Sequence, residues 1–178
     1  MKNIRTILFF SLLPAGAAVA AETALPLANA GFEERLTGWN NANDNGMSAA
    51  VPEAARGGKL GLRVTDTSDT LGSSLAAKRF PTTPGKTYEI RFQGRIVQGE
   101  GIAVYLRFYD AKGAYLNTPE LKNQINVPVR RTDTEWKQFS KKGVAPAGAV
   151  QGEVWIHSFT KNVVTADFDD FVLVAIEP

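Results

Sequence analysis

The sequence predicts an all-β protein that folds as an antiparallel β-sandwich. Apolar and polar residues alternate with a period of two in several segments, the pattern of strands with one face in a core and one in solvent. Turn-forming groups of Gly, Pro and Asp separate these segments, as at 81–85, 110–113 and 145–148. With no internal repeat and no low-complexity linker, the pattern predicts a single domain.

Five segments carry the strand pattern, in chain order 59–64, 88–95, 102–110, 151–159 and 166–176. The apolar residues on the inward face of the first four are Leu60, Leu62 and Val64; Tyr88, Ile90 and Phe92; Ile102, Val104, Leu106 and Phe108; and Val154 and Ile156. The fifth segment is apolar on both faces apart from three aspartates. Residues 117–133 have the least regular alternation of apolar and polar residues. This pattern predicts a long loop that can include a short strand.

The first 20 residues have the features of a secretory signal peptide. Lys2 and Arg5 precede an apolar run over 7–13, residues 14–16 break it, and Ala18 and Ala20 give the small-x-small pattern of a cleavage site. The run is too short to span a bilayer, which takes about 18 apolar residues. We therefore expect a signal peptide at 1–20, one domain at 21–178, and a secreted or periplasmic protein.

Charge and cysteine content exclude several classes of protein. The chain has 20 basic and 18 acidic side chains, and removal of residues 1–20 would leave 18 of each. A balanced charge excludes nucleic acid and anionic membranes as partners, because both need a concentrated positive surface. Without cysteine there are no disulfides, so the fold depends on its hydrophobic core, with or without a metal. A domain of about 160 residues is long enough to bury such a core.

A glycan-binding surface is predicted on the outward faces of the middle strands, if those strands are neighbours. A sugar ring stacks its C–H face on aromatic rings, and its hydroxyls need donors and acceptors. The outward residues of these types are Arg91, Gln93, Tyr105, Arg107, Glu153, Trp155 and His157. Alternatively, Trp155 is covered by the 117–133 loop or lies in a dimer contact. Trp39 and Trp136 flank a turn or begin a strand, and we expect both in the core.

Several stretches resemble successive strands of carbohydrate-binding modules with a galactose-binding-like jelly roll, the type often appended to cellulases and xylanases. They are "NAGFEE" with "GW", "GGKLGLRV", "KTYEIRFQGR", "AVYLRFYDAKGAYL", "EWKQFSKKGVAPAGAVQGEVWIH" and "ADFDDFVLV". The resemblance covers nearly all of 21–178 and implies a jelly roll, a glycan ligand, and a separate catalytic protein as a possible partner.

The same resemblance implies a structural calcium held by Glu33 and Asp169, with backbone carbonyls of the turn at 56–59. Calcium takes six to eight oxygen ligands, and two carboxylates from opposite ends of a chain repel unless a cation lies between them. Alternatively, Glu33, Glu34, Asp167 and Asp170 are surface charges, and Asp169 pairs with a Lys or Arg.

An enzyme is a weaker interpretation of the same residues. His157 is the only histidine, cysteine is absent, and no Gly-x-Ser-x-Gly elbow occurs. A polysaccharide lyase is the most plausible activity, with Arg107, Gln93, His157 and Tyr105 neutralising a uronate and moving its proton. A third possibility is an adhesion or assembly module that binds protein, although the mixed aromatic and polar surface favours a hydroxyl-rich ligand.

Overall fold

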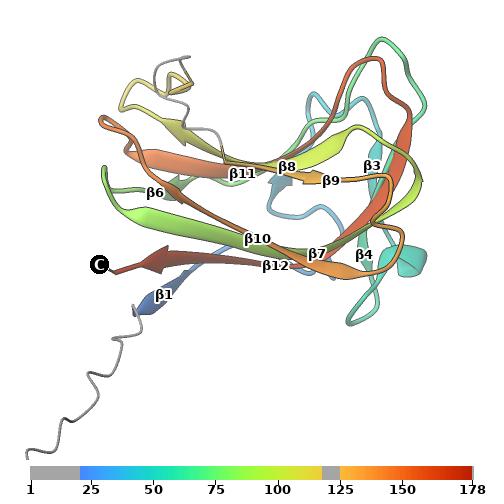
Figure 1. Cartoon of the computed structure of the whole chain (residues 1–178), viewed down its shortest axis with the longest axis horizontal. Coiled ribbons are helices and arrows are strands. Elements are labelled where there is room, and N and C mark those ends of the chain that lie inside the picture. Colours follow the sequence, from blue (N-terminus) through green and yellow to red (C-terminus); the bar gives the residue numbers. More distant parts are fainter. Residues whose placement is uncertain (1–20, 118–124, 178) are drawn as a thin grey trace, which may run out of the picture.

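The protein is a sandwich of two six-stranded antiparallel sheets, as the sequence predicts (Figure 1). The computed structural model describes residues 21–117 and 125–177, so the predicted signal peptide and part of the 117–133 segment lie outside it. The strands are β1 (Glu22–Leu25), β2 (Trp39–Asn40), β3 (Ser48–Val51), β4 (Gly61–Asp66), β5 (Leu75–Ala77), β6 (Phe80–Pro81), β7 (Thr87–Gly99), β8 (Ile102–Tyr109), β9 (Ile125–Val129), β10 (Lys137–Val144), β11 (Gln151–Ser158) and β12 (Val164–Ile176).

Sheet A has the strand order β10-β7-β12-β4-β3, with β1 also paired to β12. Sheet B has the order β2-β5-β11-β8-β9, with β6 also paired to β11. In Figure 1, β7 and β12 lie in the lower layer and β8, β9 and β11 in the upper one. The described residues include one short 3₁₀ helix, Pro52–Ala54, and contain no helix of the length and hydropathy needed to cross a membrane.

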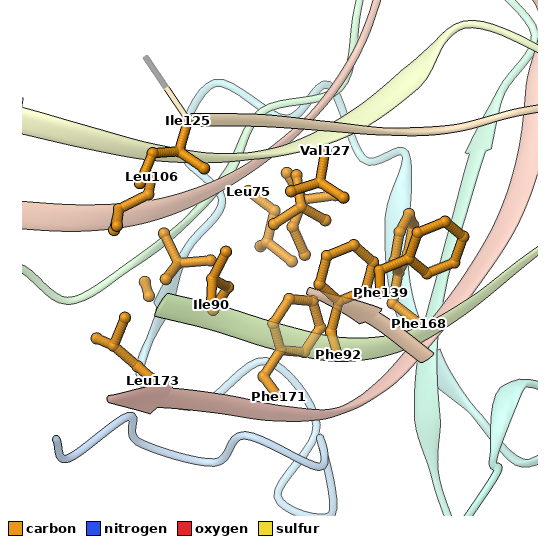
Figure 2. Packing of buried hydrophobic residues seen from close by; sticks show 14 of the residues in the cluster. Leu75, Ile90, Phe92, Leu106, Ile125, Val127, Phe139, Phe168, Phe171 and Leu173 are labelled. Carbon is orange, nitrogen blue, oxygen red and sulfur yellow. The ribbon is translucent and has the colours of Figure 1, made fainter. Parts of the chain in front are cut away.

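The core lies between the two sheets and follows the predicted alternation. Ile102, Val104, Leu106 and Phe108 of β8 are all at most 1% exposed. Figure 2 shows the aromatic part of this core, where the Phe92 ring stacks on Phe139 and Phe171 with centroids 5.1 and 5.2 Å away. The period-two pattern therefore identifies the inward side chains, except that Leu60 lies just before β4 and is only partly buried.

The two tryptophans that the sequence predicts to lie in the core differ in burial. Trp39 is buried, as predicted, and its ring lies 5.0 Å from that of Phe32. The prediction for Trp136 is wrong: its side chain is only partly buried, and the Arg95 guanidinium lies 4.8 Å from its ring centroid. The reason is strand parity, because Phe139 of β10 points inward and a residue three positions earlier points outward.

Candidate functional site

The seven residues predicted to form one surface lie on two opposite faces of the sandwich. Arg91 and Gln93 belong to β7 in sheet A, whereas the other five belong to β8 and β11 in sheet B. The expected common surface is therefore wrong for Arg91 and Gln93. The chain crosses from one sheet to the other between β7 and β8, through a tight turn with Gly99 at φ 76° and Gly101 at φ 97°.

Arg91 is held within sheet A. Its Nη2 donates to Glu22 and to Glu89, with both N···O distances at 2.5 Å. These pairs raise the pKa of Arg91, the hydrogen bond to Glu89 being the largest cause. Gln93 lies beside it on the same strand, also partly buried. Both side chains face away from sheet B.

The remaining five residues lie together, because β8 and β11 are hydrogen-bonded neighbours. Trp155 pairs with Tyr105 and Glu153 pairs with Arg107 in the register of the two strands. Odd-numbered residues on both strands point away from the core, which is filled by their even-numbered neighbours. The outer face of sheet B therefore carries the aromatic and charged set predicted from the sequence.

Three rings form an aromatic strip along this face, which we define as Tyr105, Trp155 and His157. The Trp155 and His157 rings stack with centroids 4.2 Å apart at 13°, and Tyr105 lies 5.1 Å from Trp155. The Arg107 guanidinium lies 3.9 Å from the Trp155 ring centroid, within the range of a cation–π contact. The indole N–H donates to the Ser74 hydroxyl at 2.9 Å, which fixes the ring orientation.

His157 is neutral and held in one tautomer. Its Nδ1 lies 2.5 Å from the carbonyl oxygen of Ser73, so Nδ1 carries the proton and donates it, leaving Nε2 as an acceptor. Burial lowers the pKa of His157, and the positive charge of Arg107 lowers it further. The ring therefore offers a hydrogen-bond acceptor beside the Trp155 surface.

A charged group borders the strip on the other side. The Glu153 carboxylate, 8% exposed, accepts from Arg107 Nη2 at 2.5 Å and from the Tyr109 hydroxyl at 2.6 Å. The Nε of Arg79 lies 3.6 Å from the same carboxylate, and its guanidinium lies 3.5 Å from the Tyr109 ring centroid. Burial, with the bond to Glu153, raises the pKa of Tyr109 to about 12.

Two members of this group were missed from the sequence. Tyr109 shares the parity of Tyr105 and Arg107 on β8, so the alternation itself contained the signal. Arg79 lies between the short strands β5 and β6, for which the sequence gives no clear pattern.

Two polar atoms on this face are buried and have no hydrogen-bond partner in the described part of the chain. They are Arg107 Nε and Asn126 Oδ1. Asn126 is on β9 directly opposite Tyr105 and next to the aromatic strip. Buried polar atoms are nearly always paired with protein, water or ligand, so a ligand can reach these two only if the side chains that cover them move.

The two carboxylates of the expected calcium site meet at one turn, as predicted. Asp169, 1% exposed, accepts from the backbone N–H groups of Arg56 and Gly57 at 2.8 and 3.0 Å. Glu33 accepts from the N–H groups of Lys59 and Leu60 at 2.9 and 3.2 Å. The acids at both ends of the chain therefore fix the same glycine turn before β4.

The donor set at this turn fits a calcium ion only in part. Within the described ranges, no group of three or more Asp, Glu, His or Cys side chains is placed to hold a metal. Glu33 and Asp169 supply oxygens, and backbone carbonyls of 56–59 would have to complete the six to eight ligands. Because backbone N–H groups already satisfy both carboxylates, the turn does not need a cation to pair them. Calcium here stays a prediction.

The alternative, in which four acids are surface charges and Asp169 pairs with a Lys or Arg, is correct only in part. Asp169 accepts from backbone N–H groups and forms no salt bridge with a described residue. Glu33, Glu34 and Asp170 are exposed, and Asp170 pairs with Arg56 at 3.4 Å. Asp167 is fully buried instead, because Arg63 and Arg95 cover it at 2.7 and 2.8 Å on the outer face of sheet A.

Comparison with known proteins agrees with this geometry. The family model described as a carbohydrate binding domain matches residues 27–162. The structure is similar to the CBM22-1 xylan-binding domain of Paenibacillus barcinonensis Xyn10C, with 20% identity, a TM-score of 0.63, and coverage of 90% of this chain and 99% of that one. A comparison with curated proteins finds no match.

Two further solved structures share the fold. One is a family 16 carbohydrate-binding module, with 23% identity, a TM-score of 0.61, and coverage of 83% of this chain and 97% of that one. The other is TmCBM61 in complex with β-1,4-galactotriose, with 19% identity, a TM-score of 0.52, and coverage of 83% and 95%. At these identities the likeness shows the fold alone.

The packed sheets and their connections define a β-sandwich of the carbohydrate-binding jelly-roll type. Because the family model spans most of the chain, the protein belongs to the carbohydrate-binding domain family CBM_4_9.

Proposed function

We propose that the protein binds a polysaccharide or oligosaccharide on the outer face of sheet B and has no catalytic activity of its own. The observation that carries the proposal is the aromatic strip, because it presents stacked rings on a face turned away from the core. Trp155 and His157 are partly exposed, whereas Tyr105 is 4% exposed and packs beside Trp155. Leaving large rings partly exposed to water costs free energy unless a ligand covers them. Two of the similar structures, a xylan-binding domain and a module in complex with β-1,4-galactotriose, support the ligand class.

The polar groups around the strip match the rim of a sugar. His157 Nε2 is left as an acceptor on this ring, and Arg107 and Asn126 lie beside the strip, each with one buried polar atom that has no partner among the described residues. A pyranose stacked on Trp155 presents hydroxyls outward around its ring, where donors and acceptors of both kinds are needed. The arrangement binds a hydroxyl-rich ligand better than an apolar protein surface, which favours a glycan over a protein-binding adhesion module.

A polysaccharide lyase is the less favoured alternative because its proposed residues are separated or already bound. Gln93 lies on the opposite sheet from Tyr105 and His157. Arg107 is paired with Glu153, and burial raises the pKa of Tyr105 to about 12, which makes it a poor base at neutral pH.

Export, calcium and a catalytic partner are further parts of the proposal. The sequence of residues 1–20 supports export to the periplasm or the medium. Glu33 and Asp169 lie at one turn, which supplies two carboxylates for a structural calcium, although backbone N–H groups also bind both of them. A binding module acts by holding a catalytic protein near its glycan, so a glycoside-degrading enzyme is the partner we propose.

The test is a broad panel of neutral and acidic glycans applied to the purified protein. Binding is measured on the panel, and unsaturated products are followed by absorbance in the same wells. We expect binding to at least one glycan class without release of product. Product release would show a lyase, and no binding to any glycan would contradict the proposal.

A further inference from the structure

A pocket opens at the end of the aromatic strip, beyond His157. It has a volume of about 470 Å³. Its walls come from the β7–β8 turn, the end of β9, and the segment after β11, and include Glu100, Pro128, Arg130, Arg131, Phe159 and Asn162. A second cavity of about 490 Å³ adjoins it and shares Glu100, Arg131 and Asn162 with it. Neither cavity contains a residue of the predicted glycan site.

The pocket is continuous with the strip along the strands. Phe159 follows His157 on the same face, with ring centroids 6.0 Å apart, and it lines the pocket. Its backbone N–H donates to the carbonyl of Gly101 at 2.6 Å, which prolongs the β8–β11 pairing by one step. From Trp155 to Phe159 the strand advances about 13 Å, at roughly 3.3 Å per residue, the scale of a short oligosaccharide.

Arg130 lies on this same face by parity. Asn126 and Pro128 of β9 alternate with the buried Ile125, Val127 and Val129, and Arg130 is the next residue in the outward series. The pairing of Ile102 with Val129 places Gly101, and with it Phe159, beside Arg130. The last row of the face therefore holds an aromatic ring and a guanidinium.

The charge in the pocket is positive. Arg130 and Arg131 line it together with one carboxylate, Glu100. Neither guanidinium forms a salt bridge with a described residue, although the charge of Arg130 contributes to the lowered pKa of the nearby Asp133. The nearby Asp133 carboxylate accepts from the backbone N–H of Arg130 at 2.9 Å and from Lys137 at 3.1 Å. Guanidinium groups without a protein partner bind carboxylate and sulfate oxygens through paired N–H donors.

We infer that the ligand is an acidic glycan, whose anionic group enters this pocket and binds Arg130 and Arg131 while neighbouring sugars stack on the aromatic strip. The inference rests on the proposed glycan binding and adds the ligand class. A carboxylate of a uronic acid and a sulfate ester share the required chemistry.

The experiment compares matched glycan pairs by isothermal titration calorimetry. One arm uses oligogalacturonates and aldouronic xylo-oligosaccharides with their carboxyl-reduced forms, and the other uses carrageenan oligosaccharides with their desulfated forms. We expect at least one acidic probe to bind about tenfold more tightly than its neutral form, a preference that decreases with added salt. The arm that shows the preference identifies the anion.

The double variant Arg130→Gln/Arg131→Gln should remove the preference and keep the affinity for the neutral form. Lys112→Gln/Lys142→Gln lowers the net charge equally at other sites and should change neither. Equal binding of both forms in every pair, or a preference that survives loss of the two arginines, overturns the inference while binding itself stands. Weaker binding of both forms by Trp155→Ala, with the neutral form still bound by the arginine variant, shows that the proposed function holds, and no binding by the wild type contradicts both.

Discussion

Replacing Glu153 with Gln tests whether the charged group holds the binding face in shape. The Glu153 carboxylate accepts two hydrogen bonds, one from Arg107 Nη2 at 2.5 Å and one from the Tyr109 hydroxyl at 2.6 Å. The Glu153 side chain is 10% exposed. A hydrogen bond to a charged group contributes about 1.5–3 kcal/mol. Gln keeps one weaker acceptor, so we expect a loss of about 2 kcal/mol in the free energy of unfolding.

That loss corresponds to a decrease of about 4–8 °C in melting temperature for a domain of this size. Differential scanning calorimetry measures it, and Glu177→Gln is the matched control. Glu177 pairs with Lys86 with 46% of its side chain exposed, so its loss should cost at most about 1 kcal/mol. Glycan affinity of Glu153→Gln should also decrease, because Arg107 is no longer held over Trp155. Equal melting temperatures for both variants and the wild type refute this reasoning.

Two further outcomes are expected. Chelation should lower the melting temperature if calcium binds the native state, and the double variant Glu33→Gln/Asp169→Asn should abolish that sensitivity. A melting temperature that a chelator does not change, in purified protein that contains no metal by elemental analysis, rejects the site. The imidazole of His157, the only histidine, should titrate below 6.5 by NMR, because burial lowers its pKa. The unfolded chain then binds the proton more readily than the folded protein does. The neutral His157 ring therefore contributes fully to the free energy of unfolding above pH 6.5, and this contribution is lost as the pH falls through the folded pKa. A midpoint at or above 6.5 contradicts the enclosed ring.

The fold was predictable because alternation reports directly on burial. In segments 102–110 and 151–159, apolar residues recur at every second position over 102–108 and 154–156, and the structure buries those residues. The same pattern explains why five of the seven predicted binding residues lie together, since β8 and β11 are neighbours. Alternation thus gives the side of a strand that faces the core.

Alternation does not give the sheet to which a strand belongs. The turn at Gly99 and Gly101 has the composition of a hairpin, yet it leads from sheet A to sheet B, and this separates Arg91 and Gln93 from the rest. Long-range partners are equally hidden from local sequence. Asp167 is buried because Arg63 and Arg95 come from two other strands to cover it, and no pattern around residue 167 encodes them.

Glycan affinity of Trp155→Ala and Trp136→Ala, measured by calorimetry on the best ligand of the panel, tests the central claim most directly. Both tryptophans are partly buried. Trp155 lies on the outer face of sheet B, and Trp136 lies against Arg95 on the outer face of sheet A. We predict that Trp155→Ala weakens binding by about 1–3 kcal/mol, or roughly 5- to 150-fold, and that Trp136→Ala leaves it within about twofold. A folded Trp155→Ala variant with unchanged affinity, or an equal loss in Trp136→Ala, would contradict binding on sheet B.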